Sequence, residues 1–151
     1  MPKAIILVGI PGAGKTTYAK KYFSDAVYIG SDAIRKEWYG KESCMGNHRK
    51  VHAEMHRRCK ETLASGKDIV IDSMNIRAHS RAKLIHVMKS AGASVQITAV
   101  FINTPLHIAL MNNRRRERHV PPIGIVLLHV LLKPPKQHEG FDSVLCISPN
   151  P

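Results

Sequence analysis

Features typical of secreted, disulfide-stabilised or membrane-spanning proteins are missing from this sequence of 151 residues. Its three cysteines, Cys44, Cys59 and Cys146, are an odd number without the spacing of a metal site, so we expect reduced thiols. No apolar run is long enough to span a bilayer, and residues 1–3 lead into an apolar segment without the layout of a signal peptide. We therefore expect a cytoplasmic protein with no membrane partner.

Acidic residues are also scarce. The chain has 11 aspartates and glutamates against 23 lysines and arginines, which gives a formal net charge of +12. This excess favours a polyanionic partner such as nucleic acid, although many basic proteins owe their charge to solubility alone. The hydrophobic share of 44% argues against a disordered chain, and the length suits one domain with a buried core.

The most informative segment is residues 9–16, Gly-Ile-Pro-Gly-Ala-Gly-Lys-Thr, which fits the phosphate-binding pattern G-x-x-x-x-G-K-[ST] at every fixed position. An apolar, strand-like run precedes it and a helix-compatible segment follows. Glycines let successive backbone N–H groups curl around phosphate oxygens, and the helix N-terminus adds a positive dipole. The alternative is a glycine-rich turn that merely opens a helix. The complete pattern and its flanks favour a nucleoside triphosphate site.

Two side chains of this loop have distinct expected roles. Lys15 would reach the β- and γ-phosphates, and the Thr16 hydroxyl would ligate Mg²⁺, so ATP and Mg²⁺ are the predicted cofactors. The residues expected to contact the nucleotide are Gly9, Pro11, Gly12, Ala13, Gly14, Lys15, Thr16 and Thr17.

Apolar strand-like segments alternate with helical segments along the chain, which is typical of a parallel sheet with helices on both faces. The predicted strands cover 4–8, 26–29, 68–72, 95–102 and 144–147. The predicted helices cover 15–23, 32–38, 48–64, 81–91, 105–116 and 122–132. Ser31 and Thr104 are expected N-caps, and Pro105 an expected first helical residue. The prediction is a single-domain α/β P-loop NTPase over residues 1–151, with about five parallel strands and a frayed tail at 148–151.

Polar residues that follow the strands are candidate site residues, because open α/β sheets bind ligands beyond the carboxyl ends of their strands. Asp32 would accept a proton from an attacking hydroxyl, or it only favours the first turn of a helix. Arg35, on the same helix face, would hold an acceptor phosphate, orient Asp32 or form an intrahelical ion pair. Asp72 would hold Mg²⁺ through water, bind the acceptor or only terminate its strand. Asn75 would shape the turn after that strand.

Residues 114–118, Arg-Arg-Arg-Glu-Arg, form the densest basic cluster. The cluster would fold over the triphosphate as an arginine-bearing lid, with Arg114, Arg116 and Arg118 pointing one way if the backbone is extended. A solvated basic helix end is the alternative.

Two helical segments carry further patterns. The predicted helix 48–64 is rich in basic residues and is either an electrostatic track for an acceptor strand or a wet face. His48, His52 and His56 recur every four residues on it, but no carboxylate or cysteine completes a metal set. The apolar segment 123–132 predicts a buried helix, and a homo-oligomer would form there.

In order along the chain, the segments GIPGAGKTT, SDAIR, IVIDSMN, RRRERHVPP and HEGFD resemble the kinase domain of the bacteriophage-type polynucleotide kinases and their small bacterial relatives. The resemblance runs from residue 3 to residue 147. Many unrelated NTPases share the phosphate-binding loop, whereas the arginine run followed by Val120-Pro121 is more specific. Small kinases of metabolites or nucleosides match the motifs up to Asp72 equally well.

The resemblance implies transfer of the γ-phosphate of ATP to a 5′-hydroxyl end of DNA or RNA. Asp32 matches the family's general base, and with Lys15 and Arg116 it forms the implied catalytic set. The implied acceptor-binding residues are Arg35, Asp72, Asn75, Arg81 and Val120.

The arginine run can be matched to the family in two registers that differ by one residue. Arg114 and Arg118 are implied nucleotide contacts. Asn112 and Asn113 stand where an Arg-Asn pair is common, so Arg115 is an alternative to Arg116. The expected function is a polynucleotide 5′-hydroxyl kinase. The alternatives are a kinase of a small molecule and an ATP-binding nucleic-acid module without transferase activity.

Overall fold

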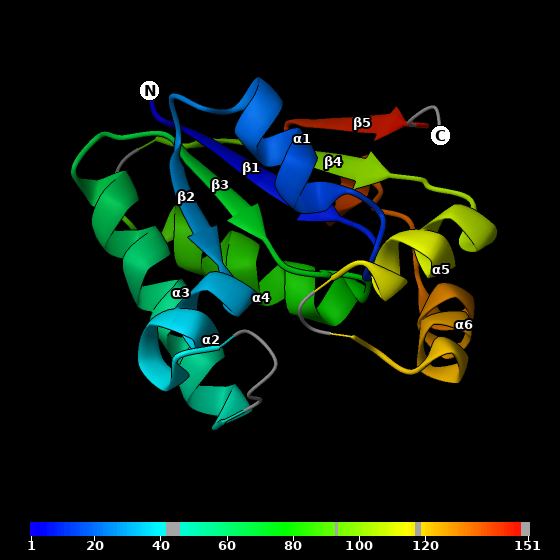
Figure 1. Cartoon of the computed structure of the whole chain (residues 1–151). Coiled ribbons are helices and arrows are strands. Elements are labelled where there is room, and N and C mark those ends of the chain that lie inside the picture. Colours follow the sequence, from blue (N-terminus) through cyan, green and yellow to red (C-terminus); the bar gives the residue numbers. More distant parts are fainter. Residues whose placement is uncertain (42–45, 93, 117–118, 149–151) are drawn as a thin grey trace.

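A five-stranded, entirely parallel sheet forms the centre of the computed structural model, which describes residues 1–41, 46–92, 94–116 and 119–148. The strand order is β2-β3-β1-β4-β5, so β1 lies in the middle (Figure 1). The strands are β1 (Lys3–Val8), β2 (Val27–Gly30), β3 (Ile69–Asp72), β4 (Gln96–Ile102) and β5 (Ser143–Ile147). The predicted α/β class with five parallel strands is confirmed.

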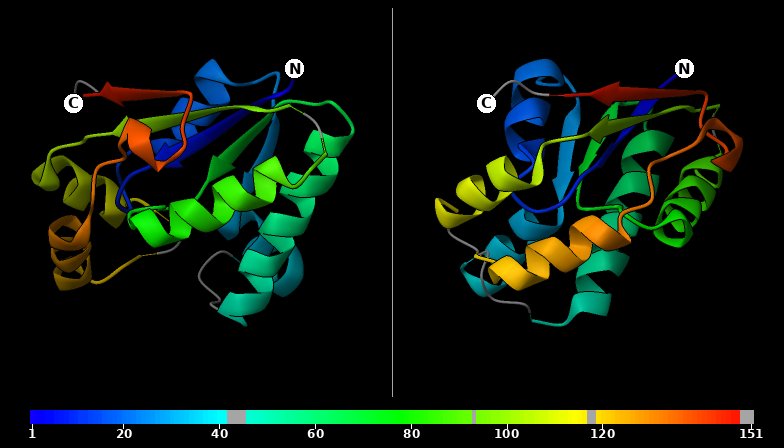
Figure 2. Two further views of the ribbon diagram at one scale, coloured as in Figure 1. Left: turned by 180° about the vertical axis from the view of Figure 1, so that it is seen from behind. Right: turned by 90° about the vertical axis from the view of Figure 1, so that its right-hand side faces the viewer.

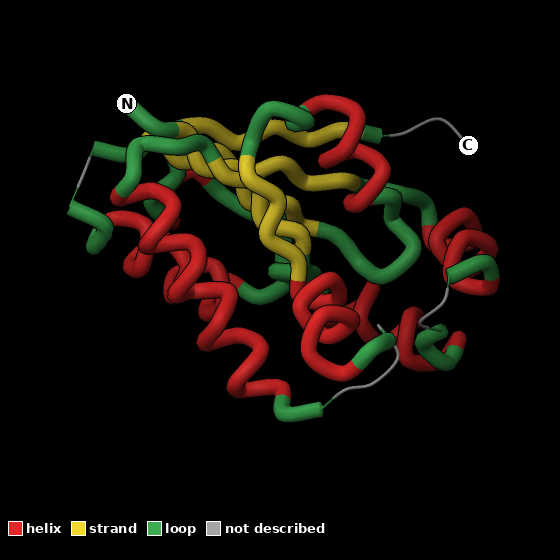
Figure 3. Tube along the Cα trace, turned by 60° about the vertical axis from the view of Figure 1, so that its left-hand side comes forward, coloured by secondary structure: helices red, strands yellow, loops and turns green. Residues whose placement is uncertain are grey.

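Helices cover both faces of this sheet, as Figures 2 and 3 show. One core joins one face of the sheet to α2, α3 and α4, and a second core joins the other face to α1, α5 and α6. The helices are α1 (Lys15–Tyr22), α2 (Ser31–Tyr39), α3 (His48–Ala64), α4 (Ala78–Lys89), α5 (Leu106–Arg114), α6 (Pro122–Leu131) and the short 3₁₀ helix η1 (Gln137–Glu139).

The central strand β1 shows why the sheet needs cover on both sides. Ala4 and Ile6 pack into the core of α2, α3 and α4, whereas Ile5 and Leu7 pack into the core of α1, α5 and α6. All four are buried, because a parallel strand between two neighbours has helices above and below it. A continuous apolar run is therefore what this position requires.

The carboxyl ends of the strands bring four connecting segments to one edge. β1 leads into the loop before α1, β2 leads directly into α2, β3 leads into residues 73–77, and β4 leads towards α5. Gly30 at the end of β2 pairs with Asp72 at the end of β3, so the start of α2 lies beside that carboxylate. The site described below occupies this edge.

Some helix ends differ from the prediction. Gly30, not Ser31, is the N-cap of α2, and Pro105 is the N-cap of α5, which begins at Leu106. The Thr104 hydroxyl caps no helix, because it donates a 2.7 Å hydrogen bond to the carbonyl of Ala13. Helix α4 begins at Ala78 instead of Arg81, and α5 ends at Arg114. Of the predicted tail, residues 149–151 lie outside the described residues.

Helix α6 is far less buried than its composition suggests. Only Ile125 is fully enclosed, while the exposed fractions of Ile123, Leu127 and Val130 are 81%, 57% and 72%. The expectation of a buried helix was wrong, because α6 packs along one narrow stripe at the margin of the second core. A subunit contact through this helix stays a prediction. Within the described ranges no helix is both long and apolar enough to cross a membrane.

Candidate active site

The loop between β1 and α1 is shaped by two glycines with left-handed backbones. Gly12 has φ +83° and Gly14 has φ +97°, a region that residues with a Cβ atom rarely adopt. A Cβ on Gly12 would lie 2.2 Å from the carbonyl oxygen of Ala109 in α5. At Gly12, therefore, both the backbone conformation and the available space require glycine.

Side chains near α5 fix this loop from outside. Besides the bond from Thr104 to Ala13, the Asn112 amide donates a 2.9 Å hydrogen bond to the carbonyl of Gly12. Two loop carbonyls thus have partners, and the loop N–H groups and the N-terminus of α1 can face the cleft. That arrangement suits an anion such as a triphosphate.

Lys15 lies at the start of α1 and is buried in this loop. Its Nζ donates a 3.0 Å hydrogen bond to the carbonyl of Ile10. Burial lowers the pKa of Lys15 to about 8, an effect that nearby Asp72 opposes and Arg116 reinforces. The ammonium is therefore poorly solvated, and an anionic phosphate would supply the partner that water does not.

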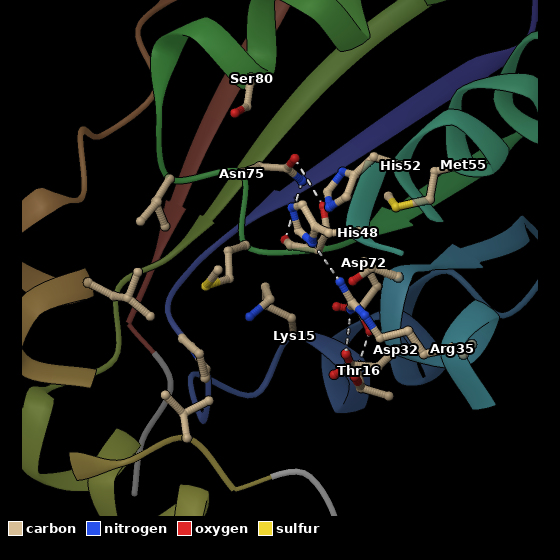
Figure 4. A pocket seen from close by; sticks show the side chains of 18 of the residues that line it. Lys15, Thr16, Asp32, Arg35, His48, His52, Met55, Asp72, Asn75 and Ser80 are labelled. Atoms are coloured by element: carbon tan, nitrogen blue, oxygen red, sulfur yellow. Dashed lines mark hydrogen bonds and ion pairs between the residues drawn. The ribbon is translucent and has the colours of Figure 1, made fainter. Parts of the chain in front are cut away.

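Thr16, Asp72 and Tyr28 form a compact group in the cleft that Lys15 also lines (Lys15, Thr16 and Asp72 are labelled in Figure 4). The Thr16 hydroxyl donates a 2.5 Å hydrogen bond to Oδ2 of Asp72, and the Tyr28 hydroxyl donates to the same oxygen. Burial, and next the charge of Asp72, raise the pKa of Tyr28, so the phenol keeps its proton and acts as a donor. A hydroxyl and a carboxylate oxygen this close are the ligand types that Mg²⁺ takes beside a phosphate, so the group fits the predicted ion.

Asp32 lies between two arginines that come from different parts of the chain. Its Oδ1 accepts a 3.0 Å hydrogen bond from Arg35 on the same helix, and its Oδ2 accepts one of 3.0 Å from Arg116. Arg35 also contacts Nδ1 of His48 in α3 at 3.1 Å. The intrahelical ion pair considered for Arg35 is therefore present, and both arginines also border the cleft.

The side chain of Asn75 forms hydrogen bonds that stabilise the turn after β3. With a positive φ of 50°, it donates to the carbonyls of Leu7 and Ser73 and accepts from the Ser73 hydroxyl. These bonds join the end of β1 to the segment after β3. They favour the turn-shaping alternative for Asn75 over direct binding of an acceptor.

One cleft of about 1490 Å³ connects these groups. The predicted site residues that line it are Pro11, Gly12, Gly14, Lys15, Thr16, Thr17, Asp32, Arg35, Asp72, Asn75, Arg116 and Val120. Gly9 and Ala13 lie buried within the loop and do not line the cleft. Arg115 also lines the cleft, so both arginines that are candidates for the lid position border it.

Two predicted site residues lie elsewhere, and one cannot be placed. Arg81 is fully buried and donates to both carboxylate oxygens of Glu139 and to the carbonyl of Asn75, so its guanidinium does not reach the cleft. Arg114 is exposed at the end of α5 and does not line this cleft. Arg118 lies outside the described residues.

Several residues that help to form the site were not predicted from the sequence. Tyr28 lies in the edge strand β2, where aromatic residues are common, so its type and position do not mark it as a site residue. Its ring occupies the space that a Cβ on Gly30 would fill. Asn113 exchanges hydrogen bonds with the backbone of Val120, at 2.6 and 3.1 Å, and so closes the segment that carries Arg116.

The sequence suggested His48 only as a metal ligand. Within the described part of the chain, no group of three or more His, Cys, Asp or Glu residues is arranged to hold a metal ion.

Comparison with known proteins identifies the class. The sequence profile of an AAA domain family matches residues 5–123, which is most of the chain, so the protein belongs to this family. One curated relative is an L-seryl-tRNA(Sec) kinase of Methanococcus maripaludis, 25% identical over 78% of this chain and 47% of its own. Another is named as a bifunctional polynucleotide phosphatase/kinase of Acanthamoeba polyphaga mimivirus, 24% identical over 93% of this chain and 32% of its own. The chain thus spans less than half the length of these relatives.

Solved structures agree on the fold. A protein described as a kinase from Chloroflexus aurantiacus has a TM-score of 0.75 and 16% identity, covering 97% of this chain and 88% of that one. A chain of the Pnkp1/Rnl/Hen1 RNA repair complex also has a TM-score of 0.75, with 20% identity over 87% of this chain and 44% of that one. A gluconokinase from Sinorhizobium meliloti has a TM-score of 0.61 and 17% identity, with coverages of 97% and 82%. The chain therefore shares its fold with proteins that range from a gluconokinase to a chain of an RNA repair complex.

Proposed function

We propose that this P-loop kinase is an ATP- and Mg²⁺-dependent polynucleotide kinase that phosphorylates 5′-hydroxyl ends of DNA or RNA. The observation that carries the proposal is the position of Asp32, which lines the same cleft as Lys15 and Thr16 and is held between two arginines. A carboxylate next to phosphate-binding cations suits an acceptor that brings both a hydroxyl and a phosphodiester.

In the proposed reaction Asp32 accepts the proton of the acceptor hydroxyl. The hydroxyl oxygen forms a bond to the γ-phosphorus while the bond from that phosphorus to the β–γ bridging oxygen breaks, and ADP leaves. Lys15 would contact the β- and γ-phosphates, and Thr16 and Asp72 would hold Mg²⁺. When bound, Mg²⁺ would neutralise charge on the phosphate oxygens.

Arg116 is the proposed stabiliser of the transferred group. Its Nη2 binds Asp32, while its buried Nη1 has no hydrogen-bond partner among the described residues. A γ-phosphate oxygen would satisfy this donor, and charge that develops during transfer would strengthen the contact. Arg35 is the proposed contact for the acceptor's first phosphodiester.

The test is a label-transfer assay with Mg²⁺ and γ-labelled ATP. The acceptors are DNA and RNA oligonucleotides with either 5′-hydroxyl or 5′-phosphate ends, together with nucleosides and gluconate. We expect label only on 5′-hydroxyl oligonucleotides, with an affinity that falls steeply with salt because phosphate contacts release counterions. Label on a small molecule and on no oligonucleotide would overturn the proposal in favour of a metabolite kinase.

A further inference from the structure

The cleft continues beyond Asp32, into the space between α3 and α4. Helix α3 contributes His48, His52 and His56 to its lining (His48 and His52 are labelled in Figure 4). Residues four positions apart share one helix face, so the three rings form a row, here called the histidine row. At 1.5 Å per residue the row extends about 12 Å along the helix.

The charge of this extension is of one sign. Arg49 on α3, Arg77 before α4 and Lys83 on α4 line it. Asp32 and Asp72 are the acidic residues among the described lining residues of the whole cleft, and both lie at the reacting end. On α3, Glu54 is engaged by Arg57 and Arg58. The extension is therefore lined by cations that can contact an anionic ligand, and no described carboxylate lines it that would repel such a ligand.

Two members of the histidine row, His52 and His56, are poorly suited to carry charge. Burial, and next the neighbouring His48, lower the pKa of His52 to about 4, so its ring is neutral near pH 7. Burial and the charge of Lys83 also lower the pKa of His56. The rings of His48 and His52 lie 4.3 Å apart between centroids. Closely spaced imidazoles present flat faces on which nucleobases can stack.

A direct contact links the histidine row to the reacting end. Arg35 donates to Asp32 at one side of its guanidinium and contacts His48 at the other. A chain that placed its 5′-hydroxyl at Asp32 and its first phosphodiester at Arg35 would next meet His48 and then His52. The bases and phosphates of such a chain match the flat rings and the cations that line this space.

We propose that the space between α3 and α4 is a subsite for the acceptor strand, in which the histidine row stacks against bases behind the reacting end while Arg49, Arg77 and Lys83 contact their phosphates. This inference rests on the proposed function and adds that the acceptor is a single-stranded oligonucleotide several nucleotides long. A mononucleotide would leave the subsite empty.

The test compares acceptors of increasing length in one assay. A nucleoside 3′-phosphate and a di-, tetra- and decanucleotide, all with free 5′-hydroxyls, are phosphorylated by the wild type and by His52→Ala/His56→Ala. His48 is kept because it contacts Arg35. We expect the double variant to lose at least about tenfold more kcat/KM on the decanucleotide than on the nucleoside 3′-phosphate, since each stacking partner contributes about that factor. The matched control is His86→Ala, an exposed histidine of α4 outside the cleft, which should behave as wild type.

A second variant reports on phosphate contacts. Lys83→Ala should reduce the slope of log affinity against log salt for the decanucleotide by about 0.7, whereas Lys60→Ala, an exposed lysine of α3 outside the cleft, should not. Equal losses of kcat/KM at every acceptor length, or no loss, would overturn the subsite while leaving the kinase intact. If the wild type labels no oligonucleotide at all, the proposed function fails and the subsite fails with it.

Discussion

The two ends of the cleft are built in different ways. At the nucleotide end, residues 9–16 supply most groups from one short stretch, and hydrogen bonds to loop carbonyls hold them. At the proposed acceptor end, Asp32 and Arg35 come from α2, His48 comes from α3 and Arg116 comes from the segment after α5, and their side chains hold one another. The first arrangement depends on the backbone and the second on the choice of side chains.

A buried ion pair away from both ends gives the largest expected effect on stability. Arg81 is fully buried against Glu139, whereas the arginines around Asp32 border an open cleft. Arg81→Met should lower the free energy of unfolding by about 3–5 kcal/mol, because it leaves a carboxylate without its partner in a nearly buried place. Urea denaturation measures the change. Arg81→Met/Glu139→Met should lose less than the single variant, and an equal or larger loss would contradict the structural role assigned to this pair.

A substitution at Gly12 tests whether the backbone conformation of the loop is needed for stability and for ATP binding. Gly12→Ala adds a Cβ that would lie 2.2 Å from a carbonyl oxygen of α5, at a φ of +83°. We expect a loss of about 3 kcal/mol in unfolding free energy from strain and overpacking, together with weaker ATP binding. The control is Gly66→Ala, where φ is +84° but the space is open, and where strain alone should cost about 1 kcal/mol. Equal losses at the two glycines would show that the contact with α5 does not matter.

Tyr28 sharpens the comparison, because it supports the proposed metal ligand without lying in the phosphate-binding loop. Tyr28→Phe removes one donor to Asp72 and should raise the Mg²⁺ concentration for half-maximal activity by about tenfold. ATP binding without Mg²⁺ should stay as in the wild type. Titration of activity with Mg²⁺ measures this, with the exposed Tyr22→Phe as control. An unchanged Mg²⁺ requirement would show that Tyr28 does not support Mg²⁺ binding through Asp72.

The smallest expected effect concerns the charge of Lys15. Its pKa is lowered to about 8 by burial, so the free protein loses this charge as the pH rises through 8. Since only the ammonium can pair with phosphate, the Kd for ATP should rise about fourfold between pH 7 and pH 8.5. Calorimetry with ATP and no acceptor measures the profile and the accompanying proton uptake. A flat profile without proton uptake would mean that Lys15 keeps its charge throughout.

The same contrast explains how much of the molecule can be predicted from its sequence. The sheet, the helices and the phosphate-binding loop depend on local patterns, such as the apolar run 4–8 and the glycines at 12 and 14. The structure has each of these elements, with some helix ends shifted by a few residues. Asp32 and Arg35 are three positions apart in one helix, so their ion pair is also foreseeable.

Contacts between distant segments could not be foreseen. Nothing in the sequence distinguishes Arg81, which binds Glu139 in the interior, from Arg116, which crosses from the segment after α5 to Asp32. Tyr28 reaches Asp72 only because the two strands pair in one register and Gly30 leaves room for the ring. The burial of α6 was wrongly predicted because apolar composition does not say how much of a helix another element covers.

The central claim is that Asp32 serves transfer at an acceptor end that is separable from ATP binding. The most direct measurement compares Asp32→Asn with Asp25→Asn, which changes an exposed carboxylate before β2, by recording kcat and the Kd for ATP on the same preparations. The account predicts that Asp32→Asn lowers kcat by about 10³-fold with ATP binding retained, and that Asp25→Asn changes neither. Transfer at the wild-type rate in Asp32→Asn, or loss of ATP binding together with transfer, would contradict it.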